Sequence, residues 1–308
     1  MRVGLLDVDS KIPNLALMKI SQWHKMNGDE VEHYMPLAHS LYDKVYASKI
    51  FNFSSGSDIQ PDMTTGGTGI DLKINLPNGM DQMDPDYSLY NYPHNIGFAQ
   101  RGCRFKCSFC VVPEKEGKPK SVNTIEKLWT QRTSNFLVLL DNDFFGNPEW
   151  KDRIEEIKEL NLKVNFSQGL NIRIISERQA QALASVKFRN LKNTSSQVTF
   201  AWDQINDEKV IKRGFQRVVD AGIKPYQMQF YVLIGFDTTP EEDMHRVMML
   251  KGWGCDPYVM PYNKKDPYQR KFTRWVNHRA IFNSCTFEEY NTNWSVSGRV
   301  RRRFEYGD

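Results

Sequence analysis

Long apolar runs and abundant cysteine are both missing from this 308-residue chain. No stretch of 18 or more apolar residues occurs, so the sequence predicts no membrane-spanning helix. The opening, MRVGLLDVDSKIPN, lacks the apolar core of a signal peptide, because Asp7 and Asp9 stand where apolar residues would be needed. We therefore expect a cytoplasmic protein, in which clustered cysteines bind a metal or do redox chemistry rather than form disulfides.

Positive charge is gathered in the last part of the chain. The net charge is +4, and residues 264–308 alone hold ten Lys and Arg against five Asp and Glu. This basic C-terminal extension includes Trp275, Trp294 and the run RVRRR at 299–303. The segment could contact the phosphates of a nucleic acid, or it could be an ordinary solvated surface.

The first eighty residues have the pattern of a small α/β domain. Strands are predicted at 2–8, 29–34 and 43–51, with a helix that opens at Pro13 and Asn14 and stops at Gly28. TTGGTG at 64–69 is predicted as a flexible loop at a sheet edge. The stretch from about Leu76 to Pro93 is predicted to have little regular structure. We expect a domain over 1–80 and a linker over 81–95.

A second alternation of strands and helices covers residues 96–263. Apolar, β-branched and aromatic runs begin near residues 96, 135, 163, 197, 228 and 256, and helical segments separate them. Ser176, Asp207 and Pro240 mark helix starts, and Gly222 marks a helix end. Six such strands are too few for a closed eightfold barrel, so the pattern predicts a partial barrel or an open parallel sheet.

Polar residues follow the ends of these predicted strands. In parallel α/β proteins, chemistry gathers at the carboxyl ends of the strands. The residues at those ends are Asp141, Asn142, Asp143, Gln168, Gly169, Trp202, Asp203, Gly235, Pro261 and Tyr262. A loop with three cysteines follows the first of these strands, so we expect it at the same edge.

The three cysteines lie within eight residues, in CRFKCSFC, at Cys103, Cys107 and Cys110. Thiolates prefer zinc or iron–sulfur clusters. A structural zinc site needs four ligands, and the two remaining cysteines, Cys255 and Cys285, are distant and are predicted to be packing thiols. Three thiolates on a four-iron cluster would leave one iron open. A zinc loop or a redox loop is the alternative.

CRFKCSFC resembles the CxxxCxxC signature of the radical S-adenosylmethionine (radical SAM) superfamily, including its aromatic residue before the last cysteine, here Phe109. LLDNDFF is similar to the second-strand segment that contacts the SAM amino group, and YVLIGFDTTPEEDMHRV is similar to the fifth-strand glycine motif. The resemblance implies a partial (βα)6 barrel, a 4Fe-4S cluster and SAM. It also implies reductive cleavage of SAM to methionine and a 5′-deoxyadenosyl radical, with a reductant such as flavodoxin or ferredoxin.

This resemblance gives the strand-end residues a role in binding the cofactor. The predicted SAM-binding residues are Phe109, Asp141, Asn142, Asp143, Gln168, Arg173, Asp203 and Gly235. Asp141, Asn142 and Asp143 could instead form a simple turn. Arg173 could pair with the SAM carboxylate or form a surface ion pair, Asp203 could bind the ribose or cap a helix, and Gly235 could approach adenine or merely end a strand.

The N-terminal region resembles the Rossmann-like domain of the cobalamin-binding radical SAM subgroup, with TTGGTG in place of its GG loop. The cobalt-ligating DxHxxG signature is missing, which argues against cobalamin. Residues 1–102 contain no cysteine, which excludes the methylthiotransferase pattern. The leading hypothesis is a single-cluster radical SAM enzyme acting on a nucleic acid or nucleotide-like substrate. The alternatives are a cobalamin-dependent methyltransferase and a non-catalytic iron–sulfur or zinc module that binds nucleic acid.

Overall fold

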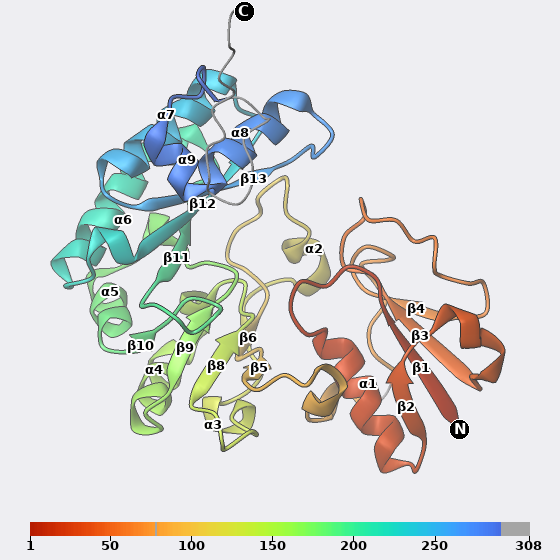
Figure 1. The fold of residues 1–308 in the computed structure, drawn as a ribbon. Helices are drawn as coiled ribbons and strands as arrows, with labels where there is room; N and C mark the ends of the chain where they lie inside the picture. The colour runs from red at the N-terminus through yellow and green to blue at the C-terminus, as the bar shows by residue number, and fades with distance from the viewer. Residues whose placement is uncertain (78, 291–308) are drawn as a thin grey trace, which may run out of the picture. The chain divides into compact units, whose positions relative to one another are not determined.

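The computed structural model describes residues 1–77 and 79–290 (Figure 1). This part of the chain is a mixed α/β protein with parallel sheets, which confirms the predicted fold class. It forms two compact units. Unit 1 comprises Met1–Asp141 and Gly146–Pro148, and unit 2 comprises Asn142–Phe145 and the chain from Glu149 onward. The partial barrel, the Rossmann-like domain and the domain boundaries given above remain predictions.

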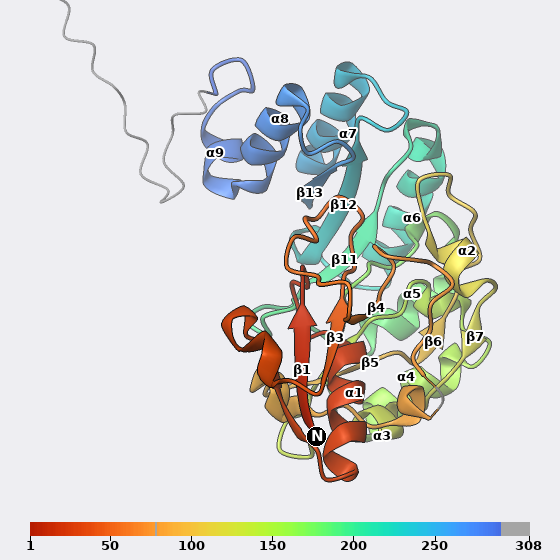
Figure 2. The same cartoon turned by 90° about the vertical axis from the view of Figure 1, so that its right-hand side faces the viewer.

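Unit 1 begins with a four-stranded parallel sheet in the order β2-β1-β3-β4 (Figure 1), and Figure 2 shows β1 and β3 side by side. Its strands are β1 (Arg2–Asp7), β2 (Glu30–His33), β3 (Lys44–Ser48) and β4 (Thr64–Gly66). Helix α1 (Leu15–Met26) begins after Asn14, whose side chain accepts the N–H groups of Ala16 and Leu17. Beyond its end, Gly28 has a φ of +79°, as predicted for the stop. A short 3₁₀ helix, η1 (Pro36–Leu41), precedes β3.

The segment TTGGTG was predicted as a loop, and this prediction is wrong for its first three residues. They form β4, which pairs in parallel with β3. The glycines explain the difference, because they allow close approach of two backbones. A Cβ on Gly67 would lie 2.2 Å from the carbonyl oxygen of Lys49, and one on Gly69 would lie 2.7 Å from the carbonyl carbon of Phe51.

The predicted linker is more ordered than expected. It contains the 3₁₀ helices η2 (Met80–Gln82) and η3 (Tyr87–Tyr90). Asp86 is buried, and its carboxylate accepts hydrogen bonds from Ser21 Oγ at 2.6 Å and Lys25 Nζ at 2.7 Å. Because both donors belong to α1, this segment is held against the first helix.

The remainder of unit 1 carries the cysteine loop. Strands β5 (Asn95–Gly97) and β8 (Phe136–Leu139) pair in parallel. Between them are β6 (Gln100–Arg101), α2 (Val112–Glu116), β7 (Lys120–Ser121) and α3 (Ile125–Leu128). Helix α3 covers only four residues of VNTIEKLWTQRT, which is the helical segment predicted between the runs that begin near residues 96 and 135. The helix does not continue because the Asn95 side chain accepts a hydrogen bond from the Gln131 N–H group and donates one to the Ser134 carbonyl.

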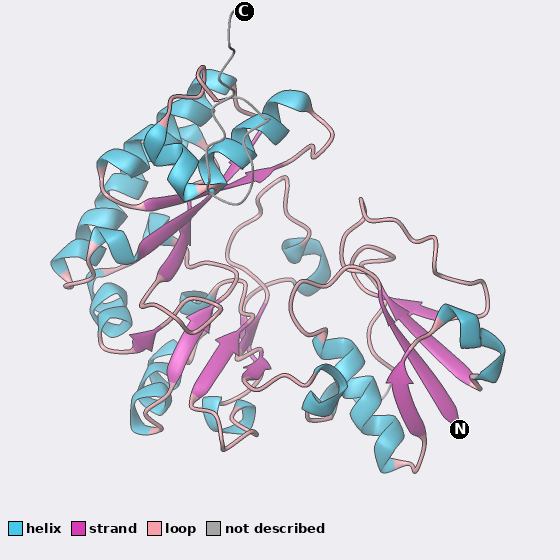
Figure 3. Cartoon of the chain, in the orientation of Figure 1, coloured by secondary structure: helices cyan, strands magenta, loops and turns pink. Residues whose placement is uncertain are grey.

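Unit 2 continues the alternation of strands and helices. Its strands are β9 (Lys163–Phe166), β10 (Lys187–Phe188), β11 (Val198–Ala201), β12 (Met228–Ile234) and β13 (Asp256–Pro261). Its helices up to β13 are α4 (Trp150–Glu159), α5 (Glu177–Ala184), α6 (Glu208–Asp220) and α7 (Pro240–Gly252). Strands β9 and β10 pair in parallel, and β11-β12-β13 form a parallel sheet with helices on one side (Figure 3). The predicted strands are confirmed, and β10 is an addition.

The helices of unit 2 begin and end next to the residues that the sequence marks for those positions. Ser176 forms a capping box with Gln179 at the start of α5, and Thr239 caps α7 with Pro240 in the first turn. Gly222, with a φ of +99°, follows the end of α6. Short 3₁₀ helices occur at η4 (Phe144–Gly146), η5 (Ile172–Ile174), η6 (Ile205–Asp207) and η7 (Pro225–Gln227). Among the described residues, every helix is too short or too polar to cross a lipid bilayer.

The start of the predicted basic extension is part of the fold. Helices α8 (Pro267–Asn277) and α9 (Arg279–Ser284) follow β13. Trp275 is only 2% exposed and packs edge to face on Phe282, so its ring belongs to the core of this segment and not to the surface that could contact phosphates. The sequence pattern hid this burial because charged residues on the opposite face of α8 surround it. Trp294 and the run at 299–303 lie outside the described residues.

Candidate functional site

The cysteine loop is closed at its base by an antiparallel hairpin. Gln100 pairs with Ser121 and Arg101 pairs with Lys120, where β6 meets β7. Inside this closure, the Cys103 N–H group donates to the Gly117 carbonyl at 3.1 Å. The loop therefore begins and ends at fixed backbone positions, and between them it is irregular except for helix α2.

Gly102, next to the first cysteine, is the tightest point of this base. Its φ is +83°, and a Cβ there would lie 2.3 Å from the Lys118 carbonyl oxygen, so only glycine fits without movement. Its N–H group donates to Glu116 Oε2 at 2.8 Å, and its carbonyl accepts Gln100 Nε2 at 2.7 Å. Both backbone groups of Gly102 are thus satisfied by buried or half-buried side chains.

Charge at the base of the loop is balanced. Arg101 forms an ion pair with Glu116 at 2.7 Å, and its guanidinium lies 4.1 Å from the centre of the Phe98 ring. Glu116 therefore contacts both the arginine and the Gly102 amide. These contacts hold the end of α2 against the start of the loop.

The thiols themselves lie toward the surface. Cys103 and Cys107 are half-buried and Cys110 is exposed. The Cys103 sulfur accepts the Phe105 N–H group at 3.5 Å, and the Cys110 N–H group donates to the Cys107 carbonyl at 3.0 Å, which turns the chain between the last two cysteines. Phe109 lies half-buried in that turn.

The donor set fits a thiolate-ligated metal group in its chemistry. Three sulfur ligands occur on one closed loop, and such ligands suit zinc or iron–sulfur clusters. In residues 1–77 and 79–290, no three His, Cys, Asp or Glu side chains converge as a ready-made metal site. Binding would therefore require the side chains of the loop to turn toward one another around the metal group.

Asp141 follows β8 and contacts the short segment between β5 and β6 that leads to the cysteine loop. Its Oδ1 accepts the Ala99 N–H group at 2.8 Å, and the residue is only 4% exposed. Burial raises the pKa of this carboxyl to about 7, against the opposing effect of the Gln100 and Ala99 amides. In unit 2, Asp143 is buried and Asn142 is half-buried.

Two predicted cofactor residues follow β9. Gln168 is exposed, and its Nε2 lies 3.4 Å from Ser167 Oγ. Arg173 donates to Asp207 Oδ2 at 3.0 Å and forms an ion pair there. Of the two alternatives given by the sequence, the structure contains the ion pair. The Asp207 carboxylate faces this arginine and makes no side-chain cap on α6.

Asp203 and Gly235 are brought together at the ends of β11 and β12. Asp203 Oδ1 accepts the Leu233 N–H group at 3.2 Å and does not cap a helix. Burial raises the pKa of the Asp203 carboxyl, although the Leu233 amide and Arg246 oppose this shift. Gly235 has a φ of +72°, and a Cβ there would lie 2.2 Å from Gln269 Nε2, so a side-chain amide lies against this glycine.

Sequence reasoning missed the group that joins these strand ends. Arg246 of α7 is fully buried and donates to the carbonyls of Trp202, Asp203 and Leu233. It also forms an ion pair with the fully buried Asp243 at 2.6 Å. Asp243 in turn accepts hydrogen bonds from Thr238 and Tyr268. We call Asp243, Arg246, Thr238 and Tyr268 the Arg246 cluster.

A sequence signal for this cluster exists. Asp243, Arg246, Val247 and Leu250 are the buried residues of α7, at the i, i+3, i+4, i+7 spacing of a single helix face. A charged pair on the apolar face of a helix is costly unless it has a dedicated partner. The spacing of Asp243 and Arg246 therefore indicates a buried network, although the overall composition of α7 makes this pattern hard to recognise in the sequence.

The two remaining cysteines belong to unit 2. Cys255 is buried, and burial raises the pKa of its thiol to about 12. Cys285 donates from Sγ to the Ile281 carbonyl at 3.6 Å within its own helix end. Both positions agree with the predicted role as packing thiols.

Comparison with known proteins adds no name to this arrangement. No protein-family model matches the sequence, and a search of curated proteins found no relative.

Proposed function

We propose that this chain is a radical SAM enzyme that uses one 4Fe-4S cluster to cleave S-adenosylmethionine reductively and modifies a nucleic acid or nucleotide-like substrate in the cytoplasm. The observation that carries the proposal is the loop of three cysteines whose backbone is fixed at both ends. Thiolates spaced in this way on one loop can hold three corners of an iron–sulfur cube and leave one corner for a cofactor.

The roles of the loop residues follow from their contacts. Cys103, Cys107 and Cys110 would be the cluster ligands. When bound, the cluster would supply the single electron, received from flavodoxin or ferredoxin, that cleaves SAM to methionine and a 5′-deoxyadenosyl radical. Glu116 and Gly102 fix the start of the loop through the 2.8 Å hydrogen bond between them, so the first ligand has a defined position before the metal group binds.

The strand-end residues divide into two groups under this proposal. Asp141, Asn142, Asp143, Gln168 and Phe109 are candidates for contact with SAM, and Asp141 already accepts the Ala99 N–H group through Oδ1. Arg173 and Asp203 are already engaged with Asp207 and with the Leu233 amide, so either residue would have to exchange a protein partner for the cofactor. Gly235 is covered by Gln269, which would have to move before adenine could approach.

The proposal is tested with anaerobically purified, reconstituted protein incubated with SAM and dithionite. Formation of methionine and 5′-deoxyadenosine is expected for the wild type, and loss of both is expected for Cys107→Ala. Cys285→Ser is the matched control, because its serine can keep the hydrogen bond to the Ile281 carbonyl, and it should retain activity.

Three outcomes would contradict the proposal. Protein without iron and sulfide would remove its basis. Bound zinc with neither product would favour a non-catalytic module, and a co-purifying corrinoid would favour a cobalamin-dependent methyltransferase.

A further inference from the structure

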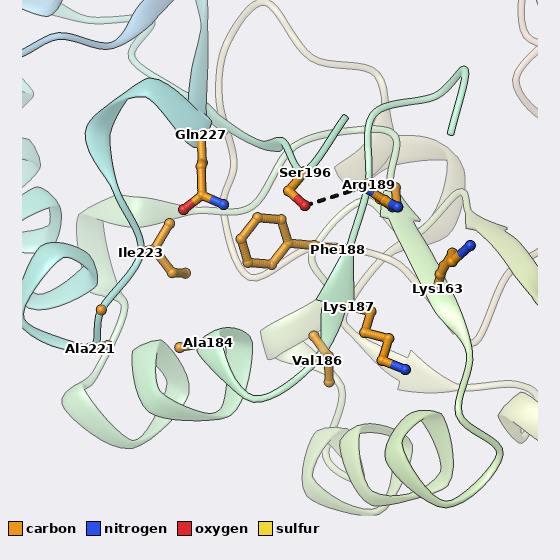
Figure 4. A pocket seen from close by; sticks show the side chains of 11 residues that line it. Lys163, Ala184, Val186, Lys187, Phe188, Arg189, Ser196, Ala221, Ile223 and Gln227 are labelled. Atoms are coloured by element: carbon orange, nitrogen blue, oxygen red, sulfur yellow. Dashed lines mark hydrogen bonds between the residues drawn. The ribbon is translucent and has the colours of Figure 1, made fainter. Parts of the chain in front are cut away.

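The pocket beside strand β10 in unit 2, of about 400 Å³ and lined by residues of the described part of the chain, does not gather its charged side chains (Figure 4). Phe188 and Ile223 face its interior, whereas Lys163 and Lys187 lie on the opposite side of β10 and extend away from one another. The base of the cysteine loop in unit 1 is different, because hydrogen bonds from separate segments of the chain meet there at one residue, Ala99.

Ala99 joins the two arms of the cysteine loop. It lies between β5 and β6 and is fully buried. Its carbonyl accepts the N–H group of Val122 at 2.9 Å and that of Asn123 at 3.4 Å, just after β7. Since β6 opens the loop and β7 closes it, Ala99 holds together the point where the chain enters the loop and the point where it leaves.

Asp141 ties this junction to the parallel sheet. Its Oδ1 accepts the Ala99 N–H group at 2.8 Å. Asp141 follows β8, whose four residues are fully buried and which pairs in parallel with β5. The Leu140 N–H group, next to Asp141, donates to the Gly97 carbonyl at 2.9 Å. The position of the carboxyl group is therefore set by the sheet rather than by the loop.

The hydrogen bond from Ala99 to Asp141 is needed whatever the charge of the carboxyl group. A buried N–H group without an acceptor is costly, and Ala99 is fully buried, so water cannot take the place of Asp141. A neutral carboxyl group keeps an acceptor oxygen, as an ionised one does. Although burial raises the pKa of Asp141 to about 7, the hydrogen bond can therefore form on either side of that pH.

The position of Ala99 is passed on to the first cysteine. Gln100, the next residue, is fully buried, and its Nε2 donates to the Gly102 carbonyl at 2.7 Å. Gly102 precedes Cys103 and lies against the Lys118 backbone. A displacement of Ala99 would therefore move Cys103 relative to the exit of the loop at β7.

We propose that Asp141 is a positioning residue of the cysteine loop. By holding Ala99, it keeps the two arms of the loop at the spacing from which Cys103, Cys107 and Cys110 bind one metal group together. The inference rests on the part of the proposed function that assigns these cysteines as metal ligands. It gives Asp141 a task that requires no contact with SAM.

The test uses cobalt(II) as the probe, titrated without oxygen into the full-length, metal-free protein, with the absorption of cobalt–thiolate bonds as the readout. We expect Asp141→Leu, which removes the acceptor, to weaken cobalt binding about tenfold or more. Asp141→Asn keeps an acceptor oxygen for the Ala99 amide and should bind cobalt within about twofold of the wild type. Asp141→Ser, whose side chain is one bond shorter, should lose affinity as the leucine variant does, and it replaces that variant if the leucine variant does not fold.

Asp86→Leu is the matched control, because it also removes a buried aspartate from unit 1. Asp86 is 7% exposed and accepts hydrogen bonds from Ser21 and Lys25 of α1. This variant should lose thermal stability but bind cobalt within about twofold of the wild type. Circular dichroism at the temperature of the titration shows whether each variant is folded. A folded Asp141→Leu protein that binds cobalt like the wild type would overturn the proposal, as would an equal loss of affinity in Asp86→Leu.

Cleavage of SAM by the reconstituted proteins separates this inference from the proposed function. If the cobalt affinities follow the expected order and the wild type forms neither methionine nor 5′-deoxyadenosine, the positioning role stands and the radical SAM proposal fails. If the wild type and Asp141→Leu take up equal iron and form equal amounts of both products, the radical SAM proposal stands and the positioning role fails. A wild type with no cobalt–thiolate absorption would contradict the metal site on which both depend.

Discussion

The cysteine loop of unit 1 and the Arg246 cluster of unit 2 use polar residues in opposite ways. In the Arg246 cluster, buried side chains hydrogen-bond to strand carbonyls and to one another. In the cysteine loop, the base is held by hydrogen bonds such as that from Gly102 to Glu116, while the thiols lie half-buried or exposed. The polar side chains of the Arg246 cluster stabilise the fold, whereas the thiols of the cysteine loop lie toward the surface.

This contrast teaches how to separate structural from functional candidates at strand ends. Asp203 and Arg246 are polar and near a predicted catalytic edge, yet their side-chain hydrogen bonds are made within unit 2. The three loop cysteines are half-buried or exposed, so their side chains contribute less to the stability of the fold than Asp203 and Arg246 do. Variants in the two regions should therefore change different measurements.

The largest effect on stability is expected from Arg246→Met. The change leaves the carboxylate of Asp243 buried without its cation and removes donors from three backbone carbonyls, those of Trp202 and Asp203 after β11 and of Leu233 in β12. We expect a loss of about 3–5 kcal/mol in the free energy of unfolding, measured by urea denaturation. Cys107→Ala should change it by less than about 0.5 kcal/mol. Comparable losses in the two variants would break the comparison.

A pH-dependent effect is expected from Asp141, which is buried at the base of the cysteine loop. Its folded pKa of about 7 lies above the ordinary value of 3.8, so between these values the folded protein holds a proton that the unfolded chain has lost. Stability should therefore fall as the pH rises from about 4 to about 7, by at most about 4 kcal/mol. Asp141→Asn should remove this slope and be the more stable form at pH 8. An unchanged pH profile of unfolding in this variant would contradict the assignment.

Gly235→Ala should destabilise the protein by roughly 1–3 kcal/mol, because it combines a left-handed backbone with a clash against Gln269. Gly252→Ala is the matched control at the end of α7, where no atom lies within 4 Å of the added carbon. That control should be neutral or stabilising by up to about 1 kcal/mol. Thermal and urea unfolding of both variants check the pair, and equal effects would show that Gly235 is not constrained.

The smallest effect is expected from Arg173→Gln. The side chains of Arg173 and Asp207 are each about one-fifth exposed. Removing the arginine should therefore lower the free energy of unfolding by no more than about 1 kcal/mol. The loss should shrink as salt is raised, as measured by unfolding at low and high ionic strength. A large loss that salt does not change would place Arg173 with the Arg246 cluster instead.

Local patterns predicted much of the fold. The six strands from residue 96 onward, the stop at Gly28 and the cap at Ser176 follow from apolar runs and from side chains that satisfy helix ends. The two residues of β10 could not be predicted, because their pairing with β9 depends on tertiary placement rather than on a run. The burial of Trp275 could not be read from the basic segment for a related reason, since it depends on the aromatic rings of α9 and Phe287.

Only part of the candidate site could be predicted from the sequence. Cys103, Cys107 and Cys110 do share a closed loop, because their spacing is local. The contacts of Arg173 and Asp203 could not be read from the chain, because Asp207 and Leu233 are brought to them only by folding. The sequence therefore predicts which residues share one loop more readily than it predicts the contacts of polar residues at the ends of separate strands.

The most direct test of the cysteine-loop assignment is the electron paramagnetic resonance spectrum of anaerobic, dithionite-reduced protein with and without SAM. We predict the signal of one reduced 4Fe-4S cluster, with a spectrum that changes when SAM is added. A protein with no such signal, or a signal that SAM leaves unchanged, would contradict the account.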